Sequence, residues 1–133
     1  MAIDWDKANV TAEEIFRKQR QNKYRAKRTE YGGVMYDSKA EAEYAERLDR
    51  QQFVGVICWW LRQVTIPLGP DFSTRVDFLV ADFNGLNRTV YAVEIKGVET
   101  REFKRVRKLW PKYGPFPLRI VKKGNVELIG GKT

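Results

Sequence analysis

Runs of apolar residues predict a β-rich centre for the chain. Residues 75–83 and 90–97 are both rich in Val, Ile, Tyr and Phe, and Asn84-Gly85 begins the polar break between them. This pattern predicts an antiparallel hairpin. Four further apolar segments are predicted as strands: residues 34–36 as a short edge strand, residues 54–68 as one long or two broken strands, residues 117–121 and residues 126–129.

Two helices are predicted before this hairpin. A capping box at Thr11–Glu14 predicts a helix that ends near Gln21. A second helix is expected over residues 39–52, with Asp37 or Ser38 as its N-cap. Its inward positions recur at the spacing of one helix face and are Ala42, Ala45 and Leu48.

A third helix is predicted after the hairpin. It begins at Glu99 or Thr100 and runs to about Lys112, where Pro and Gly residues end it. Its apolar stripe is Phe103, Val106, Leu109 and Trp110.

The order of these elements predicts the fold class. Two helices, three strands, one helix and two strands suit an α/β (α+β) domain whose mixed central sheet is flanked by helices. The chain of 133 residues is long enough for one such domain. A single domain over residues 1–133 is therefore expected, without an internal linker.

Composition narrows the possible chemistry. The chain has no histidine, which excludes a Ser-His-Asp triad and any ordinary zinc site. Its single cysteine, Cys58, suits a reducing compartment and rules out a disulfide within the chain. No apolar run approaches the length of a membrane helix, and the N-terminus lacks a signal-peptide pattern. A cytoplasmic protein is expected.

The net charge of +8 indicates either a polyanionic partner or a role in solubility alone. Nucleic acid is the first interpretation of the partner, and an anionic membrane surface is the second. Residues 17–28 hold seven basic and no acidic side chains, with Tyr24 among them. This segment is either a solvated arm or an arm that contacts phosphates and stacks on bases. The third helix is similarly basic. The candidate DNA-binding residues are Arg17, Lys18, Arg20, Lys23, Arg25, Lys27, Arg28, Arg75, Arg101, Lys104 and Lys108.

Two carboxylates and a lysine are predicted to meet in the hairpin. If its loop is centred near residues 85–86, paired residues have numbers that sum to about 171, so Asp77 lies opposite Glu94. Glu94 and Lys96 share a face, because side chains two apart in a strand do. Opposed like charges destabilise a sheet, so a divalent cation such as Mg²⁺ or Mn²⁺ is expected between them.

Three further polar residues are candidates for this site. Helical phase places Glu41 on the inward face of the second helix and Glu43 on the outward face. Glu41 is either a residue of the first helical turn that stabilises the helix through its N-terminal dipole, or a third acid of the site. Gln63 is a secondary polar ligand or a plain strand amide. Arg75 is a phosphate clamp or an ion-pair partner.

The combination of Asp77 with Glu94-Ile95-Lys96 resembles the Asp…Glu-x-Lys signature of the PD-(D/E)xK nuclease superfamily. Val76 stands where that family often has proline. Residues 36–41 also resemble the segment that carries a helix-borne glutamate in this superfamily, notably in small phage proteins and archaeal-type Holliday junction-resolving enzymes. The resemblance covers roughly residues 34–123.

The resemblance implies a restriction-endonuclease-like core over residues 34–123, preceded by a basic arm over residues 1–30. It implies phosphodiester hydrolysis with Mg²⁺ or Mn²⁺, giving a 5′-phosphate and a 3′-hydroxyl. The residues that would perform it are Asp77, Glu94 and the main-chain carbonyl of Ile95 as metal ligands, Lys96 to orient or deprotonate water, and Glu41 in support.

The same resemblance points to a homodimer that cuts four-way DNA junctions, in a host cytoplasm if the chain is phage-encoded. Trp59 and Trp60 point to opposite faces of their strand, and one of them is expected in the core. The other is either in the core under a helix or at a subunit or DNA surface. The alternatives are a general nuclease for linear, flapped or single-stranded DNA, a non-catalytic DNA-binding module, and a basic structural subunit.

Overall fold

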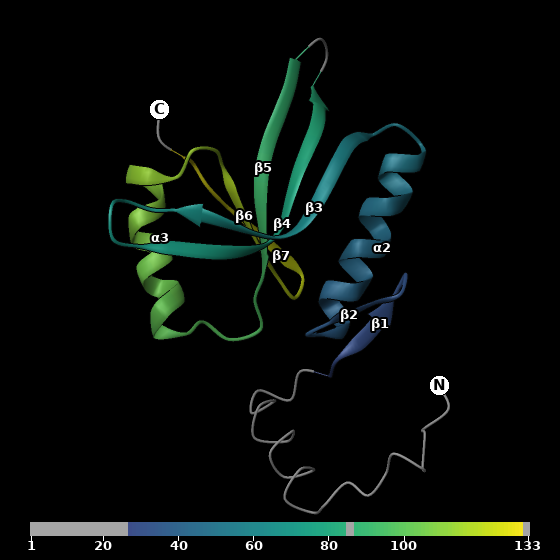
Figure 1. Cartoon of the computed structure of the whole chain (residues 1–133), viewed down its shortest axis with the longest axis horizontal. Helices are drawn as coiled ribbons and strands as arrows, with labels where there is room; N and C mark the ends of the chain where they lie inside the picture. Colours follow the sequence, from purple (N-terminus) through teal and green to yellow (C-terminus); the bar gives the residue numbers. More distant parts are fainter. Residues whose placement is uncertain (1–26, 85–86, 132–133) are drawn as a thin grey trace, which may run out of the picture.

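The computed structural model describes residues 27–84 and 87–131 and has a mixed α+β architecture (Figure 1). A small hairpin and helix α2 precede a five-stranded sheet, and helix α3 lies between the third and fourth of its strands. The elements are β1 (Thr29–Tyr31), β2 (Val34–Tyr36), α2 (Lys39–Phe53), β3 (Ile57–Pro67), β4 (Ser73–Asn84), β5 (Asn87–Ile95), α3 (Arg101–Tyr113), β6 (Leu118–Lys122) and β7 (Asn125–Ile129).

The central sheet has the strand order β3-β4-β5-β6-β7. Neighbouring strands are antiparallel except β5 and β6, which are parallel. Helix α3 connects these two strands and returns the chain to the end of the sheet at which β5 begins. The two helices lie on opposite sides of the sheet, so the molecule has three layers (Figure 1). The predicted mixed sheet flanked by helices is confirmed at this level.

Helix α2 packs its predicted inward face on one side of the sheet. Ser38 is the N-cap, and its Oγ accepts a hydrogen bond from the Glu41 N–H at 3.1 Å. The buried positions Ala42, Ala45 and Leu48 are those that the helical spacing predicts. They contact sheet residues that include Phe78, Val80, Tyr91 and Val93.

Helix α3 covers part of the other side. Thr100 caps it by accepting a hydrogen bond from the Phe103 N–H at 3.1 Å. Phe103, Val106 and Trp110 are buried, whereas Leu109 of the predicted stripe is only partly buried. These residues pack on a second cluster of apolar sheet residues, namely Ile66, Leu68, Val76, Ala92, Leu118 and Ile120.

Two expectations need correction at the ends of α2. Residues 34–36 do form a strand, but it pairs with the unpredicted β1 in a separate hairpin and does not join the central sheet. The turn between them places Gly32 and Gly33 at positive φ, which suits a two-residue hairpin loop. Residues 54–56 do not belong to the next strand, because α2 continues to Phe53 and β3 begins at Ile57.

The predicted helix at residues 11–21 lies outside the described residues, as does most of the basic arm. Among the described helices, neither α2 nor α3 is long and apolar enough to cross a membrane.

Candidate functional site

The candidate site lies where the pairing of β4 and β5 ends. The observed register pairs Phe78 with Val93, so paired residues have numbers that sum to 171 as predicted. The next pair in this register is Asp77 and Glu94. Beyond Phe78 and Val93, the carboxylates of this pair accept main-chain hydrogen bonds in place of backbone carbonyls.

Two crossed hydrogen bonds join these carboxylates to the opposite strand. The Asp77 N–H donates to Glu94 Oε2 at 3.3 Å. The Ile95 N–H donates to Asp77 Oδ2 at 2.7 Å. Each carboxylate therefore accepts a main-chain hydrogen bond from the strand that carries the other. This exchange holds both acids at the same end of the hairpin.

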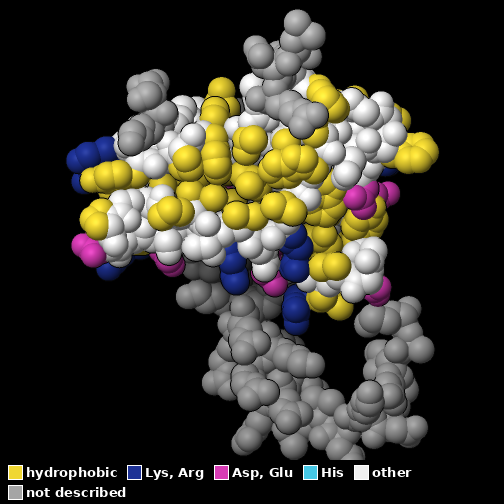
Figure 2. Space-filling model, turned by 45° about the horizontal axis from the view of Figure 1, so that its top comes forward, with side chains coloured by type: hydrophobic (Ala, Val, Ile, Leu, Met, Phe, Trp, Pro, Cys, Tyr) yellow, Lys and Arg dark blue, Asp and Glu magenta, His cyan; other side chains and the backbone are white. Residues whose placement is uncertain are grey.

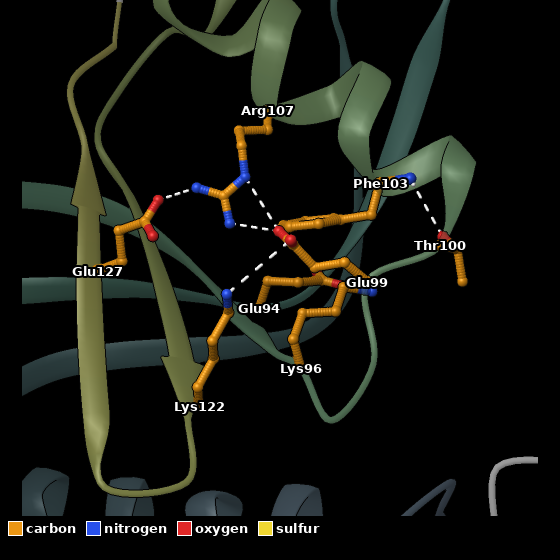
Figure 3. A network of polar contacts seen from close by, with 8 residues as sticks. All are labelled: Glu94, Lys96, Glu99, Thr100, Phe103, Arg107, Lys122 and Glu127. Atoms are coloured by element: carbon orange, nitrogen blue, oxygen red, sulfur yellow. Dashed lines mark hydrogen bonds and ion pairs between the residues drawn. The ribbon is translucent and has the colours of Figure 1, made fainter.

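Lys96 completes the predicted cluster. Its Nζ lies 2.9 Å from Glu94 Oε1, which confirms that the two side chains share a face. The same ammonium group lies 4.5 Å from the centre of the Phe103 ring of α3. Figure 3 shows Glu94 and Lys96 together beneath the start of this helix. Glu94 is 8% exposed, so this charged group is largely removed from water.

The electrostatics of the site disfavour two bare negative charges. Burial, followed by repulsion from Glu94 and Glu41, raises the pKa of Asp77 to about 8. Burial also raises the pKa of Glu94, although Lys96 opposes that change. An added positive charge would therefore be bound favourably here.

Glu41 approaches the same cluster from α2. It is partly buried, and burial, with repulsion from Asp37 and Glu94, raises its pKa to about 7. Its charge in turn contributes to the raised pKa of Asp77. Glu43 is exposed and lies 3.8 Å from Lys39 in a surface ion pair. The predicted inward phase of Glu41 and outward phase of Glu43 are both observed.

Sequence reasoning missed Arg62 of β3. Its guanidinium lies 4.5 Å from the Tyr36 ring centre, and its Nη2 donates to the Met35 carbonyl at 2.8 Å. Its positive charge opposes the rise in the pKa of Glu41. A charged residue within a long apolar strand was the available signal. The neighbouring Gln63 lies beside Asp77 across the sheet, with an unusual backbone conformation at φ 50°.

A network of charged groups was also missed (Figure 3). Arg107 of α3 forms ion pairs with Glu99, in the loop after Lys96, and with Glu127 of β7. Lys122 Nζ lies 4.0 Å from Glu99 Oε2. The hydrogen bond from Arg107 lowers the pKa of Glu99. This network ties the loop that follows the site to the far edge of the sheet.

The predicted DNA-binding residues are only partly described. Arg101, Lys104 and Lys108 are exposed on α3, and Arg75 is exposed on β4. Lys27 and Arg28 are exposed before β1. The remaining candidates lie outside the described residues: Arg17, Lys18, Arg20, Lys23 and Arg25.

The donor atoms available for a cation are oxygens. Across residues 27–84 and 87–131, no three acidic or cysteine side chains converge closely enough to hold a metal ion. Asp77 and Glu94 offer two carboxylates, and the main-chain carbonyl of Ile95 is adjacent in sequence. Such a set suits Mg²⁺ or Mn²⁺, which bind a few protein oxygens and retain water.

A cavity of about 610 Å³ lies elsewhere, beside the first half of β5. Its lining contains apolar residues and Arg119, whose guanidinium lies 3.8 Å from the Tyr91 ring centre. No acidic residue is among those that line it. The carboxylate cluster is therefore the better candidate for metal-assisted chemistry.

Comparison with known proteins gives one match. A family model described as "Protein of unknown function (DUF1064)" matches residues 21–124, which is more than half of the chain. No curated protein and no solved structure matches. The matched region contains the whole carboxylate cluster and both described helices.

We expect Asp77→Asn to stabilise the metal-free protein at neutral and alkaline pH. The ordinary pKa of this carboxyl is 3.8, and in the folded protein it is about 8. Between these values the unfolded chain has released a proton that the folded chain retains, so stability falls as pH rises. Asparagine does not titrate and can still accept the hydrogen bond from Ile95.

Thermal unfolding followed by circular dichroism in EDTA checks this expectation. The melting temperature of Asp77→Asn should exceed that of the parent, and the difference should widen from about pH 4 to pH 8. Asp82→Asn is the matched control, because Asp82 lies on the same strand and pairs with Ile57 and Thr89 rather than with the residues of the carboxylate cluster. A parent protein more stable than Asp77→Asn at pH 8 would contradict the argument.

Proposed function

We propose that this chain, which belongs to the DUF1064 family of proteins of unknown function, is a metal-dependent endodeoxyribonuclease with a restriction-endonuclease-like core. The observation that carries the proposal is the set formed by the buried Glu94 and the partly buried Asp77 and Lys96. The two acids are joined by crossed hydrogen bonds and the lysine pairs with one of them. The family resemblance of the same residues supports this reading.

The donor chemistry fits a divalent cation. Asp77, Glu94 and the main-chain carbonyl of Ile95 would hold Mg²⁺ or Mn²⁺. Burial raises the pKa of both acids, and a bound cation would favour their charged forms. When bound, such an ion stabilises the negative charge that develops on the phosphoryl and leaving oxygens.

The side chains of the site have separate roles in this proposal. Lys96, held between Glu94 and the Phe103 ring, orients the attacking water, and its neutral amine form would take the proton of that water. The water oxygen bonds to phosphorus as the bond to the 3′ oxygen breaks, and that oxygen leaves with a proton from solvent. Glu41 adds negative charge next to Asp77 and Glu94.

DNA is the proposed substrate because the chain is basic around the site. The net charge is +8, and exposed basic residues occupy the outer face of α3, which follows the site directly. Contacts from dispersed lysines and arginines read the phosphate backbone more than base sequence. A substrate recognised by shape, such as a branched duplex, suits such a surface.

A homodimer is proposed because an uncovered apolar area lies on the sheet. Trp59 and Leu61 pair with Ala81 and Leu79, and Phe83 follows two residues later on β4. Their exposed fractions are 36% for Trp59, 51% for Leu61 and 48% for Phe83. Figure 2, which brings the β4–β5 end forward, shows apolar side chains gathered across one face. Patches of this kind are typical of protein interfaces.

The orientation of the tryptophans agrees with this proposal. Trp60 packs against the α2 side of the core, and its Nε1 donates to Asp49 Oδ1 at 3.0 Å. Trp59 points to the other side and is exposed. A two-fold dimer would place two sites symmetrically, as paired nicks across a four-way junction require.

We expect Asp77→Asn, Glu94→Gln and Lys96→Ala each to reduce DNA cleavage at least about 100-fold, because each removes a group that serves the metal or the water. DNA binding should survive, since it depends on dispersed basic residues. Cleavage is measured with Mg²⁺ and with EDTA on linear, nicked, flapped and four-way DNA, and binding by fluorescence anisotropy.

The control for this series is Asp82→Asn, which should cleave like the parent. If the parent binds DNA but cleaves none of the substrates, the protein is a DNA-binding module and the nuclease proposal is wrong. Full activity of either carboxylate variant would remove the proposed site.

Glu41→Gln is expected to reduce cleavage about 10-fold or more, as loss of a supporting group near a metal typically does. Glu43→Gln should have little effect, because Glu43 faces solvent and pairs only with Lys39 among the described residues. Single-turnover rates of the two variants check this difference. Equal losses, or a larger loss for Glu43→Gln, would contradict the role of Glu41.

Junction specificity and the dimer are tested together. Light scattering at micromolar concentration should give the mass of two chains, and Trp59→Ser with Leu61→Ser should give that of one. The dimer should cut an immobile four-way junction faster than a linear duplex of the same arms. A strict monomer, or equal rates on both DNAs, would leave a general nuclease.

A further inference from the structure

The backbone of Gln63 has a conformation that its residue type rarely adopts. Its φ is 50°, and among the described residues it is the only one other than glycine at positive φ. Non-glycine residues avoid this left-handed region because Cβ crowds the backbone. Such residues concentrate where the surrounding structure requires them.

Gln63 also interrupts the pairing of β3 with β4. The ladder pairs Arg62 with Phe78 and then Val64 with Val76. The pair that would lie between them, Gln63 with Asp77, is missing from it. The break in the ladder is therefore directly opposite the candidate catalytic aspartate.

On both strands, the side of the sheet to which even-numbered side chains point changes at this break. Trp60 lies before the break on β3, and Phe78 lies after it on β4. Both pack on the α2 side of the sheet. Val64 and Val76, on the other side of the break, pack in the α3 cluster. Residues two apart in a regular strand share a face, so the two strands turn together at Gln63 and Asp77.

Figure 1 shows the result of this turn, since β3 and β4 leave the sheet as a two-stranded ribbon that extends across α3. Ile66 of that ribbon packs with Phe103 and Trp110 in the α3 cluster. We call Gln63 and Asp77 the corner of the ribbon. The crossed hydrogen bonds of Asp77 are made at this corner.

We propose that Gln63 is a positioning residue that acts through its backbone: its left-handed conformation turns the ribbon and thereby directs Asp77 to Ile95 and Glu94. The inference rests on the proposed function only for its effect on cleavage. It assigns no role to the Gln63 amide group, which distinguishes it from a role as a metal or water ligand.

Two substitutions at this position separate backbone from side chain. Gln63→Gly removes the amide but adopts positive φ without strain. Gln63→Val places a β-branched side chain where positive φ is most strongly disfavoured. Thr65→Val is the matched control, because Thr65 is exposed on the same strand and pairs regularly with Arg75. If Gln63→Val does not fold, Gln63→Thr, also β-branched, takes its place.

The first measurement is amide hydrogen exchange by NMR, which does not depend on cleavage. The Ile95 amide should be protected in the parent, in Gln63→Gly and in Thr65→Val, and at least about 10-fold less protected in Gln63→Val, because loss of the corner frees this N–H from Asp77. The amide of Val93, within the regular β4–β5 pairing, should stay protected in all four.

The second measurement is cleavage with Mg²⁺. Gln63→Gly should retain kcat within about 3-fold of the parent, and Gln63→Val should lose kcat with KM for DNA nearly unchanged, because orientation at the site and not DNA binding is affected. Loss of Ile95 protection in Gln63→Gly, or its full retention in Gln63→Val, would overturn the proposal. If the parent does not cleave DNA, the proposed function fails while the exchange data still decide the role of Gln63.

Discussion

The crossed hydrogen bonds between Asp77 and the strand of Glu94 are the constraint on which the candidate site depends. They form because the backbone ladder of β4 and β5 stops one residue pair early, which leaves main-chain N–H groups for side-chain acceptors. A buried N–H without a partner costs free energy, so each carboxylate is needed where it lies. Two acids that repel each other are thus held together by the backbone.

This arrangement places two carboxylates close together in a well-packed sheet, where burial destabilises their charged forms. Both faces around the site are closed by apolar clusters, one under α2 and one under α3. Burial against these clusters raises the pKa of Asp77, of Glu94 and of Glu41. Proteins commonly accept reduced stability at positions that serve chemistry. The packing that stabilises the fold is therefore also what raises these pKa values, on which the proposed cation site rests.

Much of this could be predicted from the sequence, because the relevant signals are local. The position of the polar break between two apolar runs predicts the hairpin register, and helical phase separates Glu41 from Glu43. Three features depended on contacts between distant segments. Strand β1 is too short to show a pattern, the Arg107 network joins residues far apart in sequence, and the turn at Gln63 arises where two strands bend together over a helix.

The parallel pairing of β5 with β6 has a consequence for the order of events during synthesis. Domains form as the chain emerges from the ribosome, N-terminal segments first. The N–H groups of Ala92 and Lys96 donate to the carbonyls of Pro117 and Val121, on the far side of α3. When Asp77 and Glu94 have both been synthesised, the nascent chain therefore still lacks β6, which pairs with the other edge of β5. Strand β5 can reach its final environment only after α3 and β6 have been translated.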